Sequence, residues 1–169
     1  TEIARACADR RPGQVRYLEH DGHANRGECA SRNLGISQAS GEYITFLDAD
    51  DVLLPRALEE EASILSRQRD VALVYGRFER WYSWTGAPAD AGRDSVCDPC
   101  VPLDARYEPA ALLSVWLRNE TAMPANCSTM FRRAALQKAG GFDEPFGDAY
   151  EDLVLLSKIV LAEPVYVAA

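Results

Sequence analysis

Residues 41–51 read Gly-Glu-Tyr-Ile-Thr-Phe-Leu-Asp-Ala-Asp-Asp, and this stretch decides how the chain folds. The run from Tyr43 to Leu47 is β-branched, aromatic and aliphatic, with a glycine before it and acids after it, which predicts a buried strand. In open α/β sheets, ligands bind outside the carboxyl ends of the strands. Asp48, Asp50 and Asp51 are therefore expected where a substrate lies, and their oxygens suit Mg²⁺ or Mn²⁺.

The same acids have a second interpretation. Asp-rich tetrapeptides are common turns, and Asp51 could simply stabilise the start of the helix expected after it. The choice between a ligand site and a plain turn depends on the rest of the chain.

The composition is that of one soluble globular domain, with 169 residues, 47% hydrophobic and 26% charged. The formal charge of -8 argues against a nucleic acid partner, because affinity for phosphate chains comes from clustered cations. A nucleotide remains compatible, since a divalent ion can bridge an acidic site to a diphosphate. No apolar run reaches the roughly 18 residues of a membrane span.

The five cysteines favour a reducing, cytoplasmic setting, because their number is odd and three of them lie in expected helices or strands. Cys97 and Cys100 have the spacing of a zinc or redox pair. A zinc site needs a second pair of ligands, so a plain loop held by Pro99 is the favoured interpretation.

Helical and strand patterns alternate along the chain, which predicts an α/β fold. Helices are expected over residues 1–10, 27–39, 55–69, 109–117 and 132–139, and from residue 151. Strands are expected over 15–19, 43–47, 71–76 with a continuation through 77–84, 127–131 and 165–167. The stretch 85–104, rich in Gly, Pro, Asp and Ala, is expected to be a long irregular loop at a lobe boundary within a single domain.

Two further local patterns predict which side chains are buried. Pro55 is expected as the first residue of its helix, with Leu58, Ala62 and Leu65 facing inward. An aromatic cluster follows the next strand, and it is expected in the core, with stacking against a sugar or base as the alternative. Its members are Phe78, Trp81, Tyr82 and Trp84.

The helix that begins near Gly27 carries basic residues suited to an anion. Arg26 precedes this helix, and Arg32 and Asn33 lie within it. A basic side chain near a helix amino terminus is a sensible diphosphate contact, because free amides and the helix dipole favour an anion there. The alternative is a pair of solvated arginines.

Three separated motifs in a fixed order resemble glycosyltransferase family 2, which has the GT-A fold. The first is Asn-Arg-Gly-Glu-Cys-Ala-Ser-Arg-Asn-Leu-Gly at 25–35, and the second is Phe-Leu-Asp-Ala-Asp-Asp at 46–51 with Pro55. The third runs from Phe-Arg-Arg at 131–133 through Gly-Gly-Phe-Asp-Glu at 140–144 to Glu151 and Asp152. The resemblance implies a Rossmann-like, mostly parallel sheet flanked by helices over residues 1–169, with 85–104 between nucleotide-binding and acceptor-side halves.

The resemblance also implies an activity, namely transfer of a sugar from a nucleotide sugar, commonly a UDP-sugar, to an acceptor hydroxyl with inversion. Asp48 and Asp50 match the family's DXD motif, whose acids bind the ribose and a Mn²⁺ or Mg²⁺ ion on the diphosphate. Asp51 would be an additional ligand. Arg32, in the family's Arg-Asn pair with Asn33, would face the nucleotide, as Arg26 would beside it.

On the acceptor side, the resemblance makes Asp152 the catalytic base, with Glu151 contacting the acceptor or a loop and with Gly141 and Phe142 nearby. The chemistry agrees, because the attacking hydroxyl must lose a proton and a carboxylate can accept it. The alternative for Glu151 and Asp152 is capping of the helix that they begin.

Family members open with a strand, a helix and a second strand that ends in an Asp-Asp-Gly-Ser turn, and none of this precedes Thr1. The first of those strands is central in the GT-A sheet, so we expect that this sequence omits residues of a longer protein. The implied role is polysaccharide or glycoconjugate synthesis in the cytoplasm, at the inner face of the membrane, with a sugar, lipid-linked or protein acceptor. Two alternatives stay open: a sugar nucleotidyltransferase, and an inactive sugar-nucleotide binding or scaffolding domain.

Overall fold

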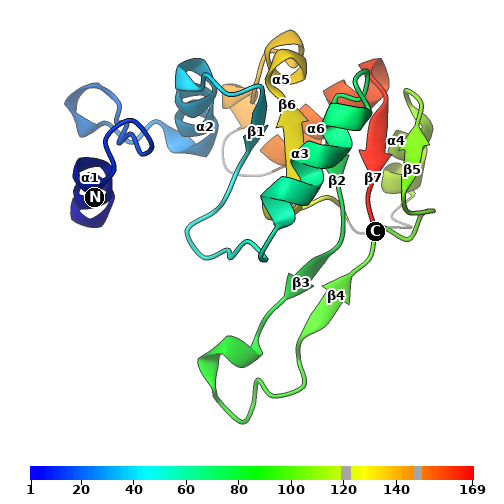
Figure 1. Cartoon of the computed structure of the whole chain (residues 1–169), viewed down its shortest axis with the longest axis horizontal. Helices are drawn as coiled ribbons and strands as arrows, with labels where there is room; N and C mark the ends of the chain where they lie inside the picture. Colours follow the sequence, from blue (N-terminus) through cyan, green and yellow to red (C-terminus); the bar gives the residue numbers. More distant parts are fainter. Residues whose placement is uncertain (119–122, 147–149) are drawn as a thin grey trace.

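A five-stranded sheet forms the centre of the computed structural model, which describes residues 1–118, 123–146 and 150–169 (Figure 1). The strand order is β1-β6-β2-β7-β5. β2 and β7 are parallel, β6 is antiparallel to both β1 and β2, and β5 is antiparallel to β7. The strands are β1 (Tyr43–Thr45), β2 (Leu73–Tyr75), β5 (Ala105–Tyr107), β6 (Thr129–Arg132) and β7 (Val165–Val167).

The directions of the strands bring several connections to one edge of the sheet. β1 and β2 are both antiparallel to β6, so they run in the same direction, as does β7. The chain segments that follow β1 and β2 therefore leave at the same edge, which we call the carboxyl edge. β6 runs the other way and starts there, and α6 (Glu151–Ala162), which leads back into β7, begins there as well (Figure 1).

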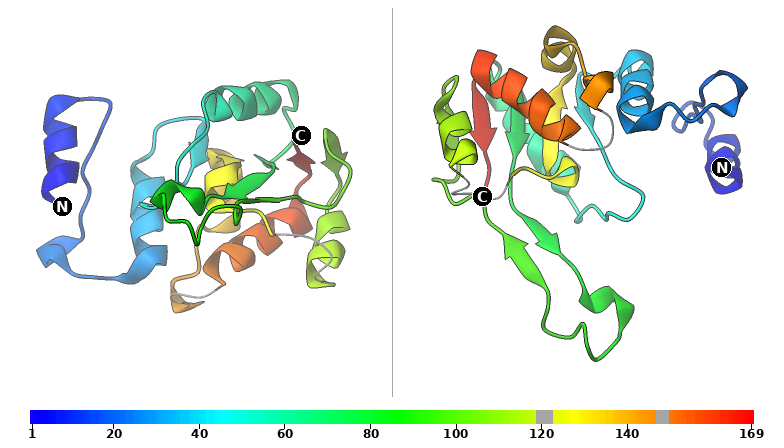
Figure 2. Two further views of the ribbon diagram at one scale, coloured as in Figure 1. Left: turned by 90° about the horizontal axis from the view of Figure 1, so that it is seen from below. Right: turned by 180° about the vertical axis from the view of Figure 1, so that it is seen from behind.

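Helices cover both faces of the sheet (Figure 2). α3 (Ala57–Arg67) packs on one face, where Leu65 meets Val74 and Met130. The other face carries α6 together with α2 (Gly27–Gln38), α4 (Ala111–Leu117) and α5 (Arg133–Ala139). Successive side chains of β2 pack on opposite faces of the sheet and so belong to both cores. Leu73 and Tyr75 point to this second face, while Val74 points to α3.

A two-stranded hairpin projects from the carboxyl edge after β2 (Figures 1 and 2). It pairs β3 (Phe78–Arg80) with β4 (Ser95–Cys97) in antiparallel register and carries the short 3₁₀ turn Ser83–Thr85 between them. The expectation that residues 77–84 continue the preceding strand is wrong, because the chain leaves the sheet at Gly76 and finds a new partner strand. That partner, β4, lies inside the stretch 85–104 that was expected to be irregular.

The expectation that the aromatic cluster lies in the core is also wrong. Trp81 is 53% exposed and Trp84 is 69% exposed, and Tyr82 is exposed beside them. The apolar spacing of these residues suggests burial, but the hairpin that carries them has no helix or second sheet packed against its tip (Figure 1).

The chain before α2 lies to one side of the sheet and its covering helices, which we call the body (Figure 1). α1 (Glu2–Arg10) buries no side chain, and Arg5 pairs with Glu19 at 2.9 Å. The strand expected over residues 15–19 is not formed, since no strand of the described chain pairs with it. A 3₁₀ turn at Asp21–His23 follows and leads into α2.

Three further boundaries differ from expectation. α3 begins at Ala57 rather than at Pro55, because Arg56 takes a left-handed conformation with φ 72° directly before it. Leu58 is 44% exposed and does not face inward, unlike Leu65. β1 is shorter than expected and half-buried, since β6 is its only partner among the strands described.

The remaining elements agree closely with expectation, with α5 ending at Ala139 before its C-cap Gly140 and β7 over residues 165–167. Two short 3₁₀ turns lie at Asn126–Ser128 and Glu144–Phe146. Within the described ranges, no helix combines the length and the apolar character needed to cross a membrane.

Candidate active site

The acidic loop, residues 48–51, follows β1 at the carboxyl edge. The amide of Asp51 donates to the carbonyl of Asp48 at 3.1 Å, so the loop is a turn, as the second interpretation of the sequence required. The turn nevertheless presents its acids to solvent, with Asp50 exposed and Asp48 and Asp51 half-buried. The turn is therefore confirmed, but Asp51 does not cap the following helix, whose N-cap is Arg56 with no side-chain cap bond. The ligand role of the three acids stays a prediction.

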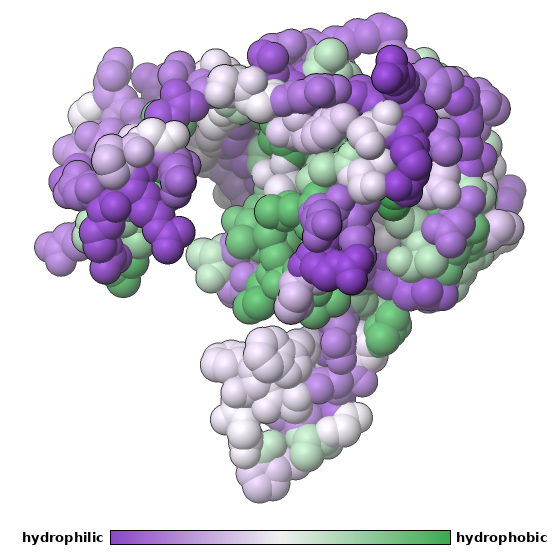
Figure 3. Space-filling model, viewed as in Figure 1, coloured by the Kyte–Doolittle hydropathy of each residue, from purple (hydrophilic) through white to green (hydrophobic). Residues whose placement is uncertain are grey.

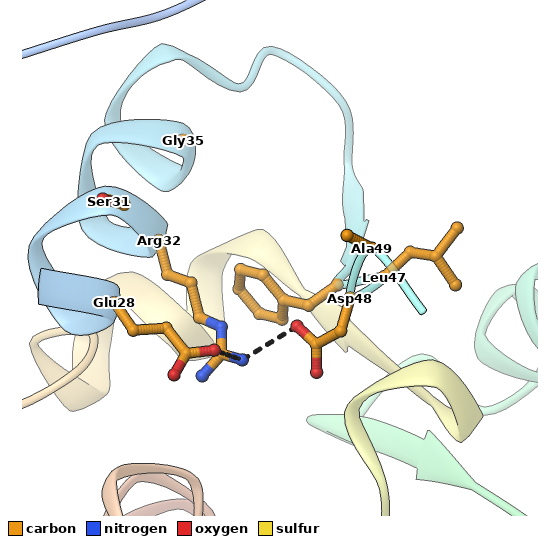
Figure 4. Close-up of a pocket in the computed structure, with 8 residues that line it drawn as sticks. Glu28, Ser31, Arg32, Gly35, Leu47, Asp48 and Ala49 are labelled. Carbon is orange, nitrogen blue, oxygen red and sulfur yellow. Dashed lines mark hydrogen bonds and ion pairs between the residues drawn. The ribbon is translucent and has the colours of Figure 1, made fainter. Parts of the chain in front are cut away.

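Arg32 connects the acidic loop to two helices. Its guanidinium donates to Asp48 Oδ1 at 3.0 Å and to Glu151 Oε1 at 3.0 Å, and it also pairs with Glu28 one turn earlier in α2. Figure 4 shows the side chain reaching from α2 between Glu28 and Asp48. The Arg32 side chain is 9% exposed and the Glu151 side chain 11%, so this ion pair is almost fully removed from water.

The carboxylates around Arg32 keep it charged. Burial lowers the pKa of Arg32. Hydrogen bonding to Asp48 and the charges of Glu28 and Asp48 raise this pKa by a larger amount, so the net shift is upward. The sequence placed Arg32 facing a nucleotide. In the structure its donors already serve carboxylates of the protein, and it holds the acidic loop against the start of α6.

Asn33 joins α2 to the turn at Gly141 and Phe142. Its Nδ2 donates to the carbonyl of Phe142 at 2.9 Å, and the amide of Phe142 donates back to Asn33 Oδ1 at 2.9 Å. Gly141 has φ +70°, and a Cβ there would lie 2.5 Å from Asn33 Oδ1. This close approach requires glycine at position 141. Both ends of the Asn33 side-chain amide, which was expected to face a nucleotide, are bonded to Phe142.

Phe142 supports the site from within the core. It is 3% exposed, its ring lies 5.2 Å from that of Phe46, and Arg32 stacks over it at 5.2 Å. Phe142 was expected on the acceptor side, but this packing leaves its ring no exposed face. Together with Gly141, it fixes the position of Arg32 and of the strand end that carries the acidic loop.

Cys127 is a residue of this site that the sequence did not reveal. Its thiol forms a side-chain hydrogen bond with Asp51, and burial followed by that bond and the Asp51 charge raises the pKa of Cys127 to about 12. The thiol is therefore neutral at physiological pH. Nothing in the local pattern links residues 51 and 127; only the return of β6 to the carboxyl edge brings them together.

The donor set fits a divalent cation held jointly with a ligand. No cluster of three or more His, Cys, Asp and Glu side chains forms a protein-only metal cage in the ranges that the structure describes. Asp48 is held by Arg32 and Asp51 by Cys127, whereas the exposed Asp50 has no side-chain partner among the described residues. One or two carboxylates with open positions is the arrangement that Mg²⁺ uses beside phosphates.

Asp152 lies in the first turn of α6, next to Glu151, and is half-buried. Its Oδ1 accepts a hydrogen bond from the amide of Leu153 at 2.6 Å, which leaves Oδ2 for other partners. Because Glu151 is bonded to Arg32 and Arg32 to Asp48, this end of α6 and the acidic loop are at the same place on the molecule. Arg26, by contrast, is exposed at the amino-terminal end of α2.

An open cleft of about 380 Å³ lies between α2 and the end of β1. Ser31, Arg32 and Gly35 of α2 line one side, and Asp48 faces Arg32 from the end of β1 (Figure 4). Phe46 is also among the lining residues. Its size falls within the usual range for small-molecule sites, which runs from roughly 300 to 1,000 Å³.

Comparison with known proteins identifies the family of this chain. The sequence matches the family described as "Glycosyltransferase like family 2" over residues 2–168. A TarS structure from S. aureus, covering its residues 1–349, superimposes with a TM-score of 0.60 at 18% identity, over 98% of this chain and 43% of that one. The α/β expectation with a glycosyltransferase fold is therefore confirmed. The expectation of a mostly parallel sheet is wrong for the residues that the structure describes, because the sheet is mixed and β2 and β7 form its one parallel pair there.

Curated relatives match shorter stretches. YibD of Escherichia coli K12, described as an uncharacterized glycosyltransferase, is 35% identical over 98 residues, which is 56% of this chain and 27% of YibD. WfgD of Escherichia coli, described as a UDP-Glc:alpha-D-GlcNAc-diphosphoundecaprenol beta-1,3-glucosyltransferase, is 33% identical over 54 residues, which is 32% of this chain and 21% of WfgD. The matched part of this chain thus spans less than a third of the length of either relative.

Proposed function

Because the chain belongs to glycosyltransferase-like family 2, we propose that it is a glycosyltransferase that moves a sugar from a nucleotide-sugar donor to an acceptor hydroxyl, with inversion and with a divalent cation. The observation that supports this most is the Asp48–Arg32–Glu151 bridge. It holds the loop that would meet the donor against the helix that would meet the acceptor.

On the donor side, Asp50 is the carboxylate best placed to hold Mn²⁺ or Mg²⁺, with Asp48 and Asp51 beside it. Such an ion, when bound with the donor, would neutralise the charge that develops on the departing nucleoside diphosphate. Asp48 is oriented by Arg32, so one of its oxygens stays fixed while the other can meet the ribose or the ion.

On the acceptor side, Asp152 is the proposed base. The acceptor oxygen attacks the anomeric carbon, the bond to the diphosphate oxygen breaks, and the hydroxyl proton passes to Asp152 Oδ2. The bond from the Leu153 amide to Oδ1 orients this carboxylate. Removal of the proton as the oxygen attacks is general base catalysis.

The name of one relative supports the proposed class of substrate. WfgD carries UDP-Glc and a diphosphoundecaprenol-linked sugar in its description, which supports a UDP-sugar donor and a lipid-linked or polysaccharide acceptor here. We place the reaction in polysaccharide or glycoconjugate synthesis at the cytoplasmic face of a membrane. We also propose that residues 1–169 act as one domain, with 85–104 between its nucleotide-binding and acceptor-side halves.

Calorimetry with the full-length protein, Mn²⁺ and a panel of UDP-sugars and other nucleotide sugars tests the donor side. Asp50→Asn is expected to abolish donor binding, whereas Asp9→Asn on the exposed α1 leaves it unchanged. Asp152→Asn is expected to bind donor normally and to lose transfer by at least about a hundredfold.

The products separate this function from its alternatives. Release of nucleoside diphosphate supports glycosyl transfer, whereas release of pyrophosphate identifies a nucleotidyltransferase. Donor binding without turnover in the full-length protein, or turnover that Asp152→Asn leaves unchanged, overturns the proposed mechanism.

A further inference from the structure

The tip of the β3–β4 hairpin exposes flat aromatic rings. Directly after β3, and reaching into the 3₁₀ turn, residues 81–84 read Trp-Tyr-Ser-Trp, and we call them the aromatic tip. Trp81 is 53% exposed, Tyr82 36% and Trp84 69%. Large exposed aromatics gathered on one projecting element mark a binding surface, because burying them on a ligand is favourable.

The aromatic tip is held in place by polar bonds within the hairpin. Asp94 Oδ1 accepts from the amides of Tyr82 at 2.7 Å and Ser83 at 2.8 Å, and Asp94 Oδ2 accepts from the Ser83 hydroxyl. Trp81 Nε1 donates to the Ser83 hydroxyl at 3.1 Å. A ligand that meets this tip therefore finds a segment already ordered, so little conformational entropy is lost on binding.

One face of Tyr82 is already used. Arg93 stacks on it at 4.1 Å and also pairs with Asp90. The amides of Tyr82 and Ser83, the Ser83 hydroxyl and Trp81 Nε1 are thus bonded within the hairpin, and the exposed rings of Trp81 and Trp84 are the main surface offered to a ligand. Such a surface recognises a flat ligand face made of C–H groups with polar groups around its rim, which describes a sugar ring.

The charges of the hairpin argue for a neutral partner. Residues 77–98 contain three arginines and four acids, a formal charge of -1. Arg77 is paired with Asp98 at 2.6 Å and Arg93 with Asp90 at 2.5 Å. An anionic lipid surface or a nucleic acid requires clustered free cations, which this hairpin does not offer.

The position of the hairpin points to the acceptor. It follows β2, so it leaves the sheet at the same carboxyl edge as the acidic loop. It also extends well beyond the sheet, and its surface is pale in Figure 3 against the green apolar surface of the body above it. A compact donor held at the acidic loop stays close to the sheet, whereas an extended acceptor can reach the tip.

We propose that the aromatic tip is a docking platform for neutral sugar rings of an extended acceptor glycan, with Trp81 and Trp84 stacking on successive units. This inference rests on the proposed function. It adds a specificity-determining surface remote from the reacting atoms, one that favours acceptors of several sugar units over a single sugar.

Fluorine NMR of full-length protein labelled with 5-fluorotryptophan tests the platform without any donor. The chain has three tryptophans, and Trp116, which is 6% exposed in the core, is an internal control for Trp81 and Trp84. The probes are maltotetraose, cellotetraose and chitotetraose at millimolar concentration. We expect the Trp81 and Trp84 signals to shift with at least one of them while the Trp116 signal does not move.

Single substitutions show which tryptophan contributes to glycan binding. Trp81→Ala and Trp84→Ala are each expected to weaken glycan binding about tenfold, and Trp84→Phe to retain most of it. Val96→Ala, an exposed change on the same hairpin, is the matched control and is expected to have no effect. Donor binding by calorimetry stays unchanged in all four variants.

Several outcomes overturn the platform: no shift with any of the three glycans, equal movement of all three tryptophan signals, or a shift produced only by vesicles of phosphatidylcholine and phosphatidylglycerol. A shift that depends on protein concentration alone assigns the tip to contact between copies of the chain. Because donor binding is measured separately, a failed platform with intact donor binding leaves the proposed function standing, and the reverse result leaves the platform standing.

Discussion

Arg32 is the residue on which the geometry of the site depends. It carries one positive charge and meets the carboxylates of Glu28, Asp48 and Glu151, so the group has an excess of two negative charges. Asp50 and Asp51 add to this excess nearby. This balance supports the proposed divalent cation, whose charge would offset the acids and allow a diphosphate to approach.

Replacing Arg32 tests this arrangement through stability. Arg32→Met leaves Glu151 buried without its partner, and we expect a loss of about 3–5 kcal/mol in the free energy of unfolding. Urea denaturation measures this loss. The double variant Arg32→Met/Glu151→Leu is expected to recover a large part of it, because the uncompensated charge is gone. If the two losses in the free energy of unfolding are simply additive, Arg32 and Glu151 do not stabilise the fold as an ion pair.

Glu61 on α3 provides a pH-dependent prediction. Burial raises the pKa of Glu61 from 4.5 to about 7. Between these two values the native state binds more protons at this group than the unfolded state, so its contribution to stability falls as the pH rises. The full effect is at most about 3 kcal/mol.

Glu61→Gln removes this titration. Relative to the unmodified chain, we expect the variant to gain stability as the pH rises from 4.5 through 7, with a plateau above. Thermal melts at a series of pH values give this difference. The exposed neighbour Glu59 is the control, since Glu59→Gln should show no such pH-dependent gain. A difference that is constant with pH would mean that Glu61 titrates normally.

At the scale of the element, the turn after α5 depends on two adjacent glycines with different surroundings. Gly140 has φ +81°, and a Cβ added there would have no neighbour within 4 Å, whereas a Cβ at Gly141 would meet Asn33 Oδ1 at 2.5 Å. Alanine at 140 therefore costs only the left-handed backbone strain, about 1–2 kcal/mol. Alanine at 141 adds the loss of both Asn33 bonds, and we expect at least about 3 kcal/mol in total.

Chemical denaturation of Gly140→Ala and Gly141→Ala measures this difference. Adding Asn33→Ala to Gly141→Ala should cost little more, because the same bonds are already broken. Equal losses at the two glycines would show that the two hydrogen bonds between Asn33 and Phe142 contribute nothing to stability.

The sequence predicted elements whose signal is local. The helix predicted over 132–139 and the strand predicted over 165–167 follow from periodicity and from a terminal glycine, and both are present, the helix from residue 133. The acidic loop was located by the strand before it. The hairpin was not predicted, because an apolar run cannot reveal that its partner is a strand well downstream, as β4 is for β3.

The roles within the site were the least predictable part. The sequence located Arg32, Asn33 and Phe142, but their contacts are with residues that lie more than a hundred positions away or in another element. Cys127 meets Asp51 only because β6 returns antiparallel between β1 and β2. Such pairings come from sheet topology, which no single stretch of sequence contains.

At the scale of the whole molecule, the segments that carry chemistry share the carboxyl edge. The acidic loop, the start of α6, the turn before β6 and the hairpin all lie there, while the opposite edge carries simple connections (Figure 1). The proposed function is therefore concentrated on one side of a sheet that is stabilised by its two covered faces. The amino-terminal segment takes no part in either core, since α1 buries no side chain.

Limited trypsin digestion tests this division. Local opening of α1 and the segment after it exposes little buried apolar surface, so it requires little free energy, and cleavage follows the population of the opened form. We expect the first cuts after Arg10 or Arg16, since Pro12 protects the bond that follows Arg11. Arg67, at the end of α3 whose Leu65 is fully buried, is the control and is expected to resist much longer. Mass spectrometry identifies the order of cleavage. A first cut within residues 57–76 would mean that α3 and β2 open before α1, and that the packing of Leu65 against the sheet does not stabilise the body as described.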